Sequence, residues 1–375
     1  MYVQRKIMKA LGRNEQCWCE SGKKYKNCHL NIQSLPSVKP YVVTQALSSL
    51  NRTKTCSVPD SLLHECSSKI IKAHTVSKSS SLKLISHEGH VLKLSVCSKN
   101  GAPPKLQAEE VGINNASTFT GFCSTHDKEL FSPIENEPFR PIPLHCFLVT
   151  YRGVSKEIAV KKDVLPIFEI MKTLDKGKDL FQQIEIQAAA KMLIDVNNLS
   201  ANDLNYIKVK LDKMLLSESY TELCYAVFTL ESPPPIMGSA IAGPKFDFNG
   251  KKAQHISSIA TDMPDYISIN SFASDGKGYV VLSWLPEHSD TCKKLIDQFL
   301  SMKLTADTLG AFMIILIENF YMSPLWWQSL DNETQKLITK LYSQGVDSPA
   351  DFGSIILSRS LHFPSISNIT MSYLL

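Results

Sequence analysis

Three cysteines and one histidine lie within thirteen positions near the start of the chain, and this cluster constrains the local fold more than any other feature. Their order is Cys-x-Cys-x8-Cys-His, with Cys17, Cys19, Cys28 and His29. Thiolate sulfur and imidazole nitrogen are preferred ligands of Zn²⁺, and four of them complete a tetrahedron. Because so short a segment cannot bury a hydrophobic core, the metal would supply its folding free energy. The sequence therefore predicts a zinc knot over residues 1–31.

The residues around these ligands form a recognisable pattern. The segment GRNEQCWCESGKKYKNCH, from Gly12 to His29, combines a Gly-Arg-Asn lead, a Cys-x-Cys pair, a Ser-Gly-Lys-Lys-Tyr-Lys turn and a Cys-His pair. It resembles the SEC-C motif, the zinc-binding tail of the bacterial preprotein translocase ATPase, where the motif contacts a chaperone and the ribosome. The resemblance implies zinc and an interaction surface, because four protein ligands leave no open coordination position for catalysis. We therefore expect a protein or ribonucleoprotein partner.

The first thirty residues are basic. They carry seven Lys or Arg residues against Glu15 and Glu20, an excess of five, whereas the whole chain has a net charge of +4. Lys23, Lys24 and Lys26 fall between the two ligand pairs, so we expect their side chains to project outward. The excess predicts contact with a polyanion or an acidic protein face, and the alternative is an ordinary solvated arm. Nucleic acid is therefore a second candidate partner.

A second group of ligand-type residues follows in the next hundred positions. Cys56 and Cys66 precede the segment GFCSTHDKELF, in which Cys123 and His126 are three positions apart at the expected start of a helix. A Cys-x2-His pair is half of a zinc site, and the two earlier cysteines would complete it, with His64 as a substitute for either. The other interpretation is that these residues are unrelated core thiols and surface histidines. We predict that the four residues bind a second Zn²⁺.

The order of these residues also resembles a treble-clef zinc module of the HNH nuclease class. The tripeptide that ends at His74, Lys-Ala-His, matches the first element of that pattern, and Asp127 falls where its last metal-binding residue lies. In such an enzyme a neutral histidine takes a proton from water, while a carboxylate holds Mg²⁺ against the scissile phosphate. The resemblance implies that His74 and Asp127 are the catalytic residues of a metal-dependent nuclease.

The remainder of the chain has the composition of a globular protein. Its 43% hydrophobic and 20% charged residues allow a buried core. The longest apolar run, Ala311–Ile317, is too short to span a membrane. The strand-like and helical segments predict a mixed α+β fold, with an antiparallel sheet covered by helices. The expected divisions are a zinc knot at 1–31, a linker at 32–54, a small irregular zinc module at 55–151, a helical segment at 152–220 and an α+β domain at 221–375.

Two local patterns give sharper predictions. A capping-box pattern at Ser200 and Asp203 predicts that a helix begins there. One face of this helix should pack, because apolar residues recur every three or four positions, at Leu204, Ile207, Leu211 and Met214. Further on, the segments YISINSF and YVVLSWL flank ASDGKG, which predicts a β-hairpin.

The cysteine distribution bears on the compartment and the function. Cysteines in short clusters with histidines nearby are typical of metal binding in a reducing compartment rather than of a disulfide framework. No apolar run of the kind found in a secretory signal precedes the first cysteine, so we expect the cytoplasm. The favoured function is a non-catalytic zinc-binding adaptor, with Zn²⁺ as its cofactor. The alternative is the nuclease, which would also require Mg²⁺.

Overall fold

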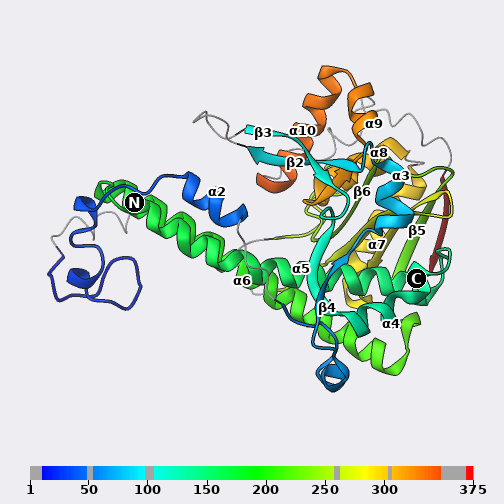
Figure 1. Ribbon diagram of the computed structural model, residues 1–375, viewed down its shortest axis with the longest axis horizontal. Coiled ribbons are helices and arrows are strands. Elements are labelled where there is room, and N and C mark those ends of the chain that lie inside the picture. The colour runs from blue at the N-terminus through cyan, green and yellow to red at the C-terminus, as the bar shows by residue number, and fades with distance from the viewer. Residues whose placement is uncertain are drawn as a thin grey trace. The chain divides into compact units, whose positions relative to one another are not determined.

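A computed structural model gives the structure of the chain. It describes residues 11–48, 54–97, 105–256, 262–302, 306–347 and 369–374. The chain forms two compact units: unit 1 comprises residues 1–53 with 160–202, and unit 2 comprises residues 54–159 with 203–375. The division falls inside the two longest helices, α5 (Pro143–Lys172) and α6 (Leu180–Ser217), which Figure 1 shows in green.

Unit 1 combines the N-terminal Cys/His segment with the ends of these two helices that face their connecting turn. The other elements of this unit are the 3₁₀ turns η1 (Tyr25–Asn27), η2 (Ile32–Ser34) and η5 (Thr173–Asp175) and the helix α2 (Tyr41–Ser48). Side-chain amides join the two long helices: Asn197 donates to the Lys161 carbonyl at 3.0 Å, and Gln187 donates to the Lys172 carbonyl at 3.0 Å. The two helices are therefore joined to each other at two places along their length.

Unit 2 is built on an eight-stranded sheet with the strand order β10-β5-β8-β7-β6-β9-β2-β3, and all of its recorded pairings are antiparallel. Its strands are β2 (His90–Cys97), β3 (Lys105–Gly112), β5 (Cys224–Leu230), β6 (Ile236–Ala242), β7 (Ile267–Ser274), β8 (Lys277–Trp284), β9 (Phe320–Met322) and β10 (Ile369–Leu374). A separate pair, β1 (Ile70–His74) and β4 (Thr118–Cys123), is also antiparallel. Besides its parts of α5 and α6, the described residues of the unit form the helices α3 (Lys83–Ile85), α4 (Ser124–Glu135), α7 (Ser289–Ser301), α8 (Ala306–Leu316), α9 (Pro324–Ser329) and α10 (Asn332–Asp347).

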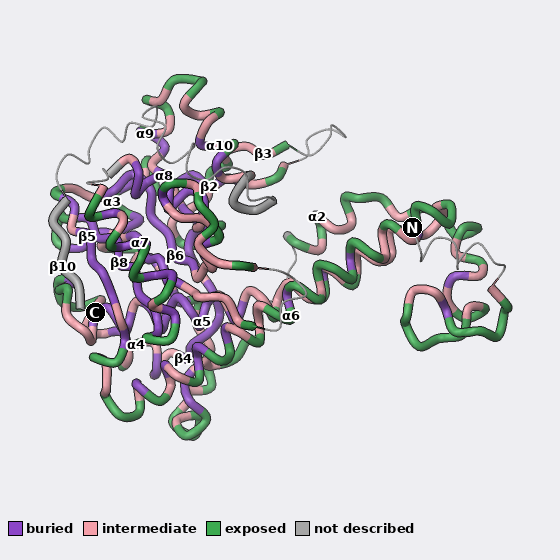
Figure 2. Tube along the Cα trace, turned by 180° about the vertical axis from the view of Figure 1, so that it is seen from behind, coloured by how far each residue is buried: buried purple, intermediate pink, exposed green. Residues whose placement is uncertain are grey.

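The central strands of the large sheet are buried on both faces, and Figure 2 shows this concentration of buried residues. In β5, Ala226 and Phe228 belong to the core cluster that includes α7, α8 and α10, whereas Val227 packs with Cys146 of α5 on the opposite face. Neighbouring residues of a strand point to opposite faces, so an unbroken apolar strand requires a cover on each side. The sheet therefore lies between two layers of helices.

The predicted α+β class, with an antiparallel sheet covered by helices, is confirmed. The sheet draws on more of the chain than the C-terminal half, because β2 and β3 form one end of it. The segment expected to be a linker contains η2 and α2. The domain boundaries inferred from the sequence remain predictions. The structure itself divides into the two units described above.

The local predictions have different outcomes. The hairpin is confirmed: β7 and β8 pair up to Ser274 and Lys277, and the turn residues Asp275 and Gly276 have φ values of 49° and 74°. The predicted packing face of α6 is also confirmed, since all four of its apolar residues are buried.

The predicted helix start at Ser200 is wrong, because α6 continues through it. The twelve residues before Ser200 contain no glycine or proline that would end a helix. The Asp203 carboxylate does not cap the helix but accepts a hydrogen bond from the Tyr266 hydroxyl at 2.9 Å.

Among the helices in the described part of the chain, none is both long enough and apolar enough to cross a lipid bilayer.

Candidate metal centres

The N-terminal ligands are carried by a tight backbone turn. An isolated β-bridge joins Gln16 to Lys24, and the Cys17 amide donates to the Lys23 carbonyl at 2.9 Å. Between these positions the chain reverses through Glu20 and Gly22, with φ values of 59° and 73°. Glycine adopts such values without steric cost, which explains its place in the turn. The reversal brings the Cys-x-Cys pair back beside the Cys-His pair.

The four predicted ligands of the first site converge. The ligand atoms of Cys17, Cys19, Cys28 and His29 all lie within 4.8 Å of one another. His29 Nδ1 is 3.2 Å from the sulfur of Cys17 and 3.1 Å from that of Cys28, and the sulfurs of Cys19 and Cys28 are 3.5 Å apart. Zinc binds sulfur at about 2.3 Å and nitrogen at about 2.0 Å, so the ligand atoms of a tetrahedral site are about 3.5 to 3.8 Å apart. The quartet therefore fits a zinc ion.

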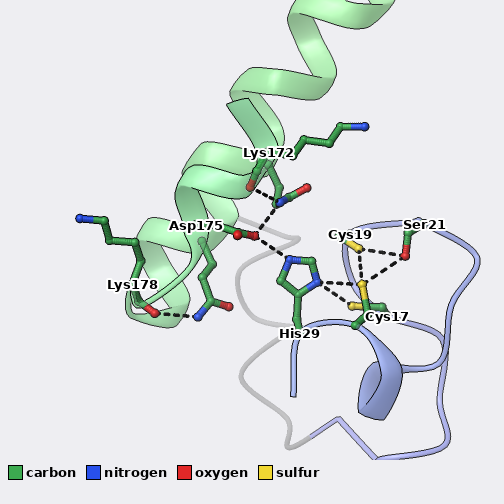
Figure 3. Close-up of polar contacts among 10 residues, drawn as sticks. Cys17, Cys19, Ser21, His29, Lys172, Asp175 and Lys178 are labelled. Atoms are coloured by element: carbon green, nitrogen blue, oxygen red, sulfur yellow. Dashed lines mark hydrogen bonds and ion pairs between the residues drawn. The ribbon is translucent and has the colours of Figure 1, made fainter. Parts of the chain in front are cut away.

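His29 also contacts a carboxylate from a distant part of the chain. Its Nε2 lies 2.8 Å from Oδ2 of Asp175, which is 146 positions away at the turn between α5 and α6. Figure 3 shows the imidazole between the cysteine sulfurs and Asp175, with one ring nitrogen facing each. The same Asp175 oxygen accepts a hydrogen bond from Gln187 at 2.6 Å. In metal sites such a carboxylate fixes the tautomer and orientation of a ligand histidine.

The surroundings shift the pKa values of these groups in different directions. Burial raises the pKa of Cys17 to about 12. Burial acts in the same direction on Cys19, but hydrogen bonds with the hydroxyl and amide of Ser21 lower its pKa to about 7. For His29, burial opposes protonation, yet the hydrogen bond to Asp175 raises the pKa above its ordinary value. Cys19 is therefore the better prepared of these two thiols to act as a thiolate ligand.

The first site opens on one side into a cleft of about 510 Å³. The N-terminal segment contributes Glu20 and Lys23 to its lining, and the two helices contribute Lys172 and Asp195. Lys191 of α6 forms an ion pair with Glu20 across this cleft. A second link lies nearby, where the Gly177 amide donates to the Ile32 carbonyl at 3.0 Å. The segment around the first site is thus joined to the turn between α5 and α6 within unit 1.

A comparison with protein families identifies this segment. Residues 13–31 match the family model of the SEC-C motif. The predicted SEC-C resemblance is thereby confirmed for these residues, and we refer to residues 13–31 as the SEC-C knot. No curated protein and no solved structure matches the chain.

The second predicted quartet also converges, although its members come from separate segments of unit 2. Cys56 precedes the 3₁₀ helix η3 (Asp60–Glu65), Cys66 follows it, and Cys123 and His126 flank the start of α4. Their ligand atoms all lie within 4.8 Å of one another. Cys123 and His126 are buried, whereas the two earlier cysteines are half-buried. Residues brought together by folding therefore provide the same ligand types as the SEC-C knot.

The surroundings of the second quartet resemble those of the first in two respects. His126 Nε2 is directed towards Glu65, with its oxygen at 4.0 Å. One thiol again has a low pKa: burial acts to raise the value for Cys123, but hydrogen bonds from the His126 amide and from Ser67 lower it to about 6. Burial and the neighbouring Cys56 thiol raise the pKa of Cys66 to about 12.

The two residues implied by the nuclease resemblance make different direct contacts, although both lie near the charges of Arg152 and Glu135. His74 ends β1, and its Nε2 lies 3.3 Å from the Ile113 carbonyl; burial lowers its pKa. Asp127 lies in the first turn of α4, with Oδ1 at 3.9 Å from Nη2 of Arg152, and burial raises its pKa. Among the described residues, no hydrogen bond or ion pair joins His74 to Asp127. The catalytic roles of these two residues remain predictions.

The sequence reasoning missed two acidic residues. Asp175 contacts the histidine of the first quartet and Glu65 contacts that of the second. Nothing in the sequence near Asp175 pointed to His29, because the contact depends on how the turn between two helices meets the knot. For Glu65, its place directly before Cys66 was a local signal that could have been used.

Proposed function

We propose that this chain is a zinc-binding adaptor, in which the SEC-C knot and the adjoining turn between α5 and α6 together bind a protein or ribonucleoprotein partner. The observation that carries the proposal is the cleft between the knot and these helices. Both walls of the cleft belong to unit 1, and the His29–Asp175 contact lies in its lining. Metal binding by the knot would thus organise one wall of a binding surface.

The ligand set is typical of a structural zinc site rather than a catalytic one, and so supports a role in partner binding. Three thiols and one imidazole fill the four positions of a tetrahedral zinc site, so no position remains for a water molecule or a substrate. Ser21 lies close to two of the sulfurs, at 3.2 Å from Cys19 and 3.4 Å from Cys28, as an outer contact. In this proposal the metal shapes the knot, and the surrounding side chains recognise the partner.

The charges around the cleft favour a protein segment as the partner. Its lining contains lysines and carboxylates in equal numbers, four of each: Lys23, Lys172, Lys176 and Lys191, and Glu20, Glu169, Asp175 and Asp195. Carboxylates within the cleft would repel a phosphate backbone, whereas a peptide with both kinds of charge would find complementary groups. Lys23 of the cleft lining and the nearby Lys24 and Lys26 are all exposed. An acidic part of a partner, including the RNA of a ribonucleoprotein, would bind there.

A capture experiment with the full-length chain tests the proposal. The chain is immobilised, exposed to native lysate, and the retained proteins and nucleic acids are both identified. We expect the triple variant Lys23→Gln, Lys24→Gln, Lys26→Gln to retain about 3- to 10-fold less partner, since each exposed ionic contact contributes about 0.2 to 0.5 kcal/mol. Retention should also decrease with added salt.

A matched control separates the knot from general charge effects. The triple variant Lys251→Gln, Lys252→Gln, Lys277→Gln removes the same charge from exposed positions of unit 2. The control should retain as much partner as the unchanged chain. If both triple variants behave alike, the lysines of the knot are only a solvated face and the proposal fails. Treatment of the lysate with ribonuclease distinguishes a partner held through RNA from one held through protein.

The proposed compartment is the cytoplasm. All ten cysteines are free thiols in the structure. Six of them belong to the two quartets, and the other four, Cys97, Cys146, Cys224 and Cys292, are half-buried or buried elsewhere. Thiolate ligands persist where the environment is reducing. A reducing compartment therefore suits the chemistry of both quartets.

A further inference from the structure

We propose that Cys56, Cys66, Cys123 and His126 bind a second zinc ion, which acts as a closed structural clamp within unit 2. The clamp fastens residues 54–67, which form no strand and only one 3₁₀ helix, to the end of β4 and the start of α4. This site lies outside the SEC-C match at residues 13–31. Its role is independent of the adaptor function proposed above.

The geometry of the quartet centres on the His126 imidazole. Nδ1 of His126 is 3.6 Å from the sulfur of Cys56, 3.4 Å from that of Cys66 and 3.2 Å from that of Cys123. In a tetrahedral zinc site, a nitrogen ligand and a sulfur ligand are about 3.5 Å apart. All three separations are therefore close to those of a zinc site, and the same ring nitrogen makes all three.

The ligand types select the metal. Three thiols and one imidazole are soft and borderline donors, a set that favours zinc over magnesium, calcium or manganese. Four protein ligands complete the tetrahedron, as in structural rather than catalytic zinc sites. An alternative interpretation, isolated core thiols, describes Cys146 and Cys292, which are fully buried and belong to neither quartet. The quartet differs from these two thiols because its four potential ligand atoms all lie within 4.8 Å of one another.

The local structure prepares two of the ligands. Cys123 is the N-cap of α4, and its sulfur accepts a hydrogen bond from the His126 amide at 3.4 Å. Amides at the start of a helix stabilise a thiolate. The His126 side chain is only 3% exposed, and its Nε2 has no hydrogen-bond partner among the described residues. Nδ1 faces the three sulfurs, so a metal bound there would leave the ring proton on Nε2, on the side of the Glu65 carboxylate.

The clamp explains how an otherwise weakly held segment reaches the core. Val58 is buried in the cluster that contains α4 and α5. The backbone of Ser57 forms two hydrogen bonds, in which its amide donates to the Gly121 carbonyl at 2.8 Å and its carbonyl accepts from the Tyr151 hydroxyl at 3.1 Å. Cys56 and Cys66 lie on either side of these contacts. One zinc ion bound by both cysteines would close the loop between Cys56 and Cys66 and so hold this segment in place.

Metal counting on the full-length protein tests the proposal. Zinc per chain is measured by elemental analysis after purification without chelators. We expect two equivalents in the unchanged protein, one in Cys66→Ser, one in Cys28→Ser and none in the double variant. Cys97→Ser, which changes a half-buried cysteine outside both quartets, should retain two equivalents. A single equivalent in the unchanged protein, unaltered by Cys66→Ser, would overturn the proposal.

A second measurement covers the case in which Cys66→Ser fails to fold. His126→Cys preserves the number of ligands, so this variant should fold and bind metal. Titration with Co²⁺ in a Cys28→Ser background isolates the second quartet. We expect absorption bands of tetrahedral thiolate-bound Co²⁺, and altered bands when His126 is replaced by Cys. Identical cobalt spectra for the two proteins would show that His126 is not a ligand and would contradict the proposed site.

Discussion

The two Cys/His quartets contain the same ligand types, but the chain assembles them in different ways. In the SEC-C knot, all four ligands lie within thirteen consecutive residues, and one turn brings them together. In unit 2, the four ligands extend from Cys56 to His126, and strands and helices must pack before they meet. Metal would therefore create the fold of the first site, whereas at the second it would stabilise a fold that hydrophobic packing has largely formed.

The carboxylates beside the two histidines show a second difference. Asp175 is almost fully buried and lies 2.8 Å from His29. The Glu65 side chain is 50% exposed and lies 4.0 Å from His126. A short hydrogen bond in a buried place orients an imidazole strongly, whereas solvent weakens a longer ionic contact. The knot thus depends on a distant residue for the orientation of its histidine, and the second quartet depends mainly on its own helix.

The largest expected effect concerns the stability of unit 2. Cys123→Ser should lower the free energy of unfolding of unit 2 by more than about 4 kcal/mol, because it removes a metal ligand in the core. Cys28→Ser should change it by less than about 0.5 kcal/mol. Urea unfolding is followed by tryptophan fluorescence in a Trp18→Phe background, where Trp284, Trp326 and Trp327 of unit 2 supply the signal. Equal losses in the two variants would remove the distinction between the sites.

The next effect concerns the distant carboxylate of the knot. Asp175→Asn should weaken zinc binding by the knot about 10- to 100-fold, because the His29 imidazole loses its ionic partner. The measurement is competition with a chromophoric chelator in a Cys66→Ser background, so that only the knot is observed. Asp195→Asn serves as the control, since Asp195 is exposed on α6 and lines the same cleft. An affinity unchanged by Asp175→Asn would mean that the contact has no role in metal binding.

The smallest effect concerns Glu65. Glu65→Gln should weaken zinc binding by the second quartet less than about 10-fold, since the contact with His126 is long and half-exposed. The same competition is carried out in a Cys28→Ser background. Glu129→Gln, an exposed residue of α4, provides the control. A loss as large as that caused by Asp175→Asn would show that burial and distance do not separate the two carboxylates.

Sequence reasoning was most successful where the required contacts are local. The hairpin of β7 and β8 was predictable because Asp275 and Gly276 suit a tight turn between two strand-like segments. The packing face of α6 was predictable from its period. The start of that helix was predicted wrongly, because a capping-box pattern at Ser200 and Asp203 does not end the preceding run of helix-forming residues, and α6 already begins at Leu180.

The sequence by itself determined which four residues of the SEC-C knot could bind a metal, because spacing within one turn leaves few alternatives for four side chains of these types. The sequence also predicted which residues form the second quartet, but not where in the fold these residues come together. Only the tertiary structure brought Cys56 and Cys66 to the start of α4 and Asp175 to His29. Local geometry is encoded in neighbouring residues, whereas a contact across 146 positions depends on the packing of whole helices, which no short pattern specifies.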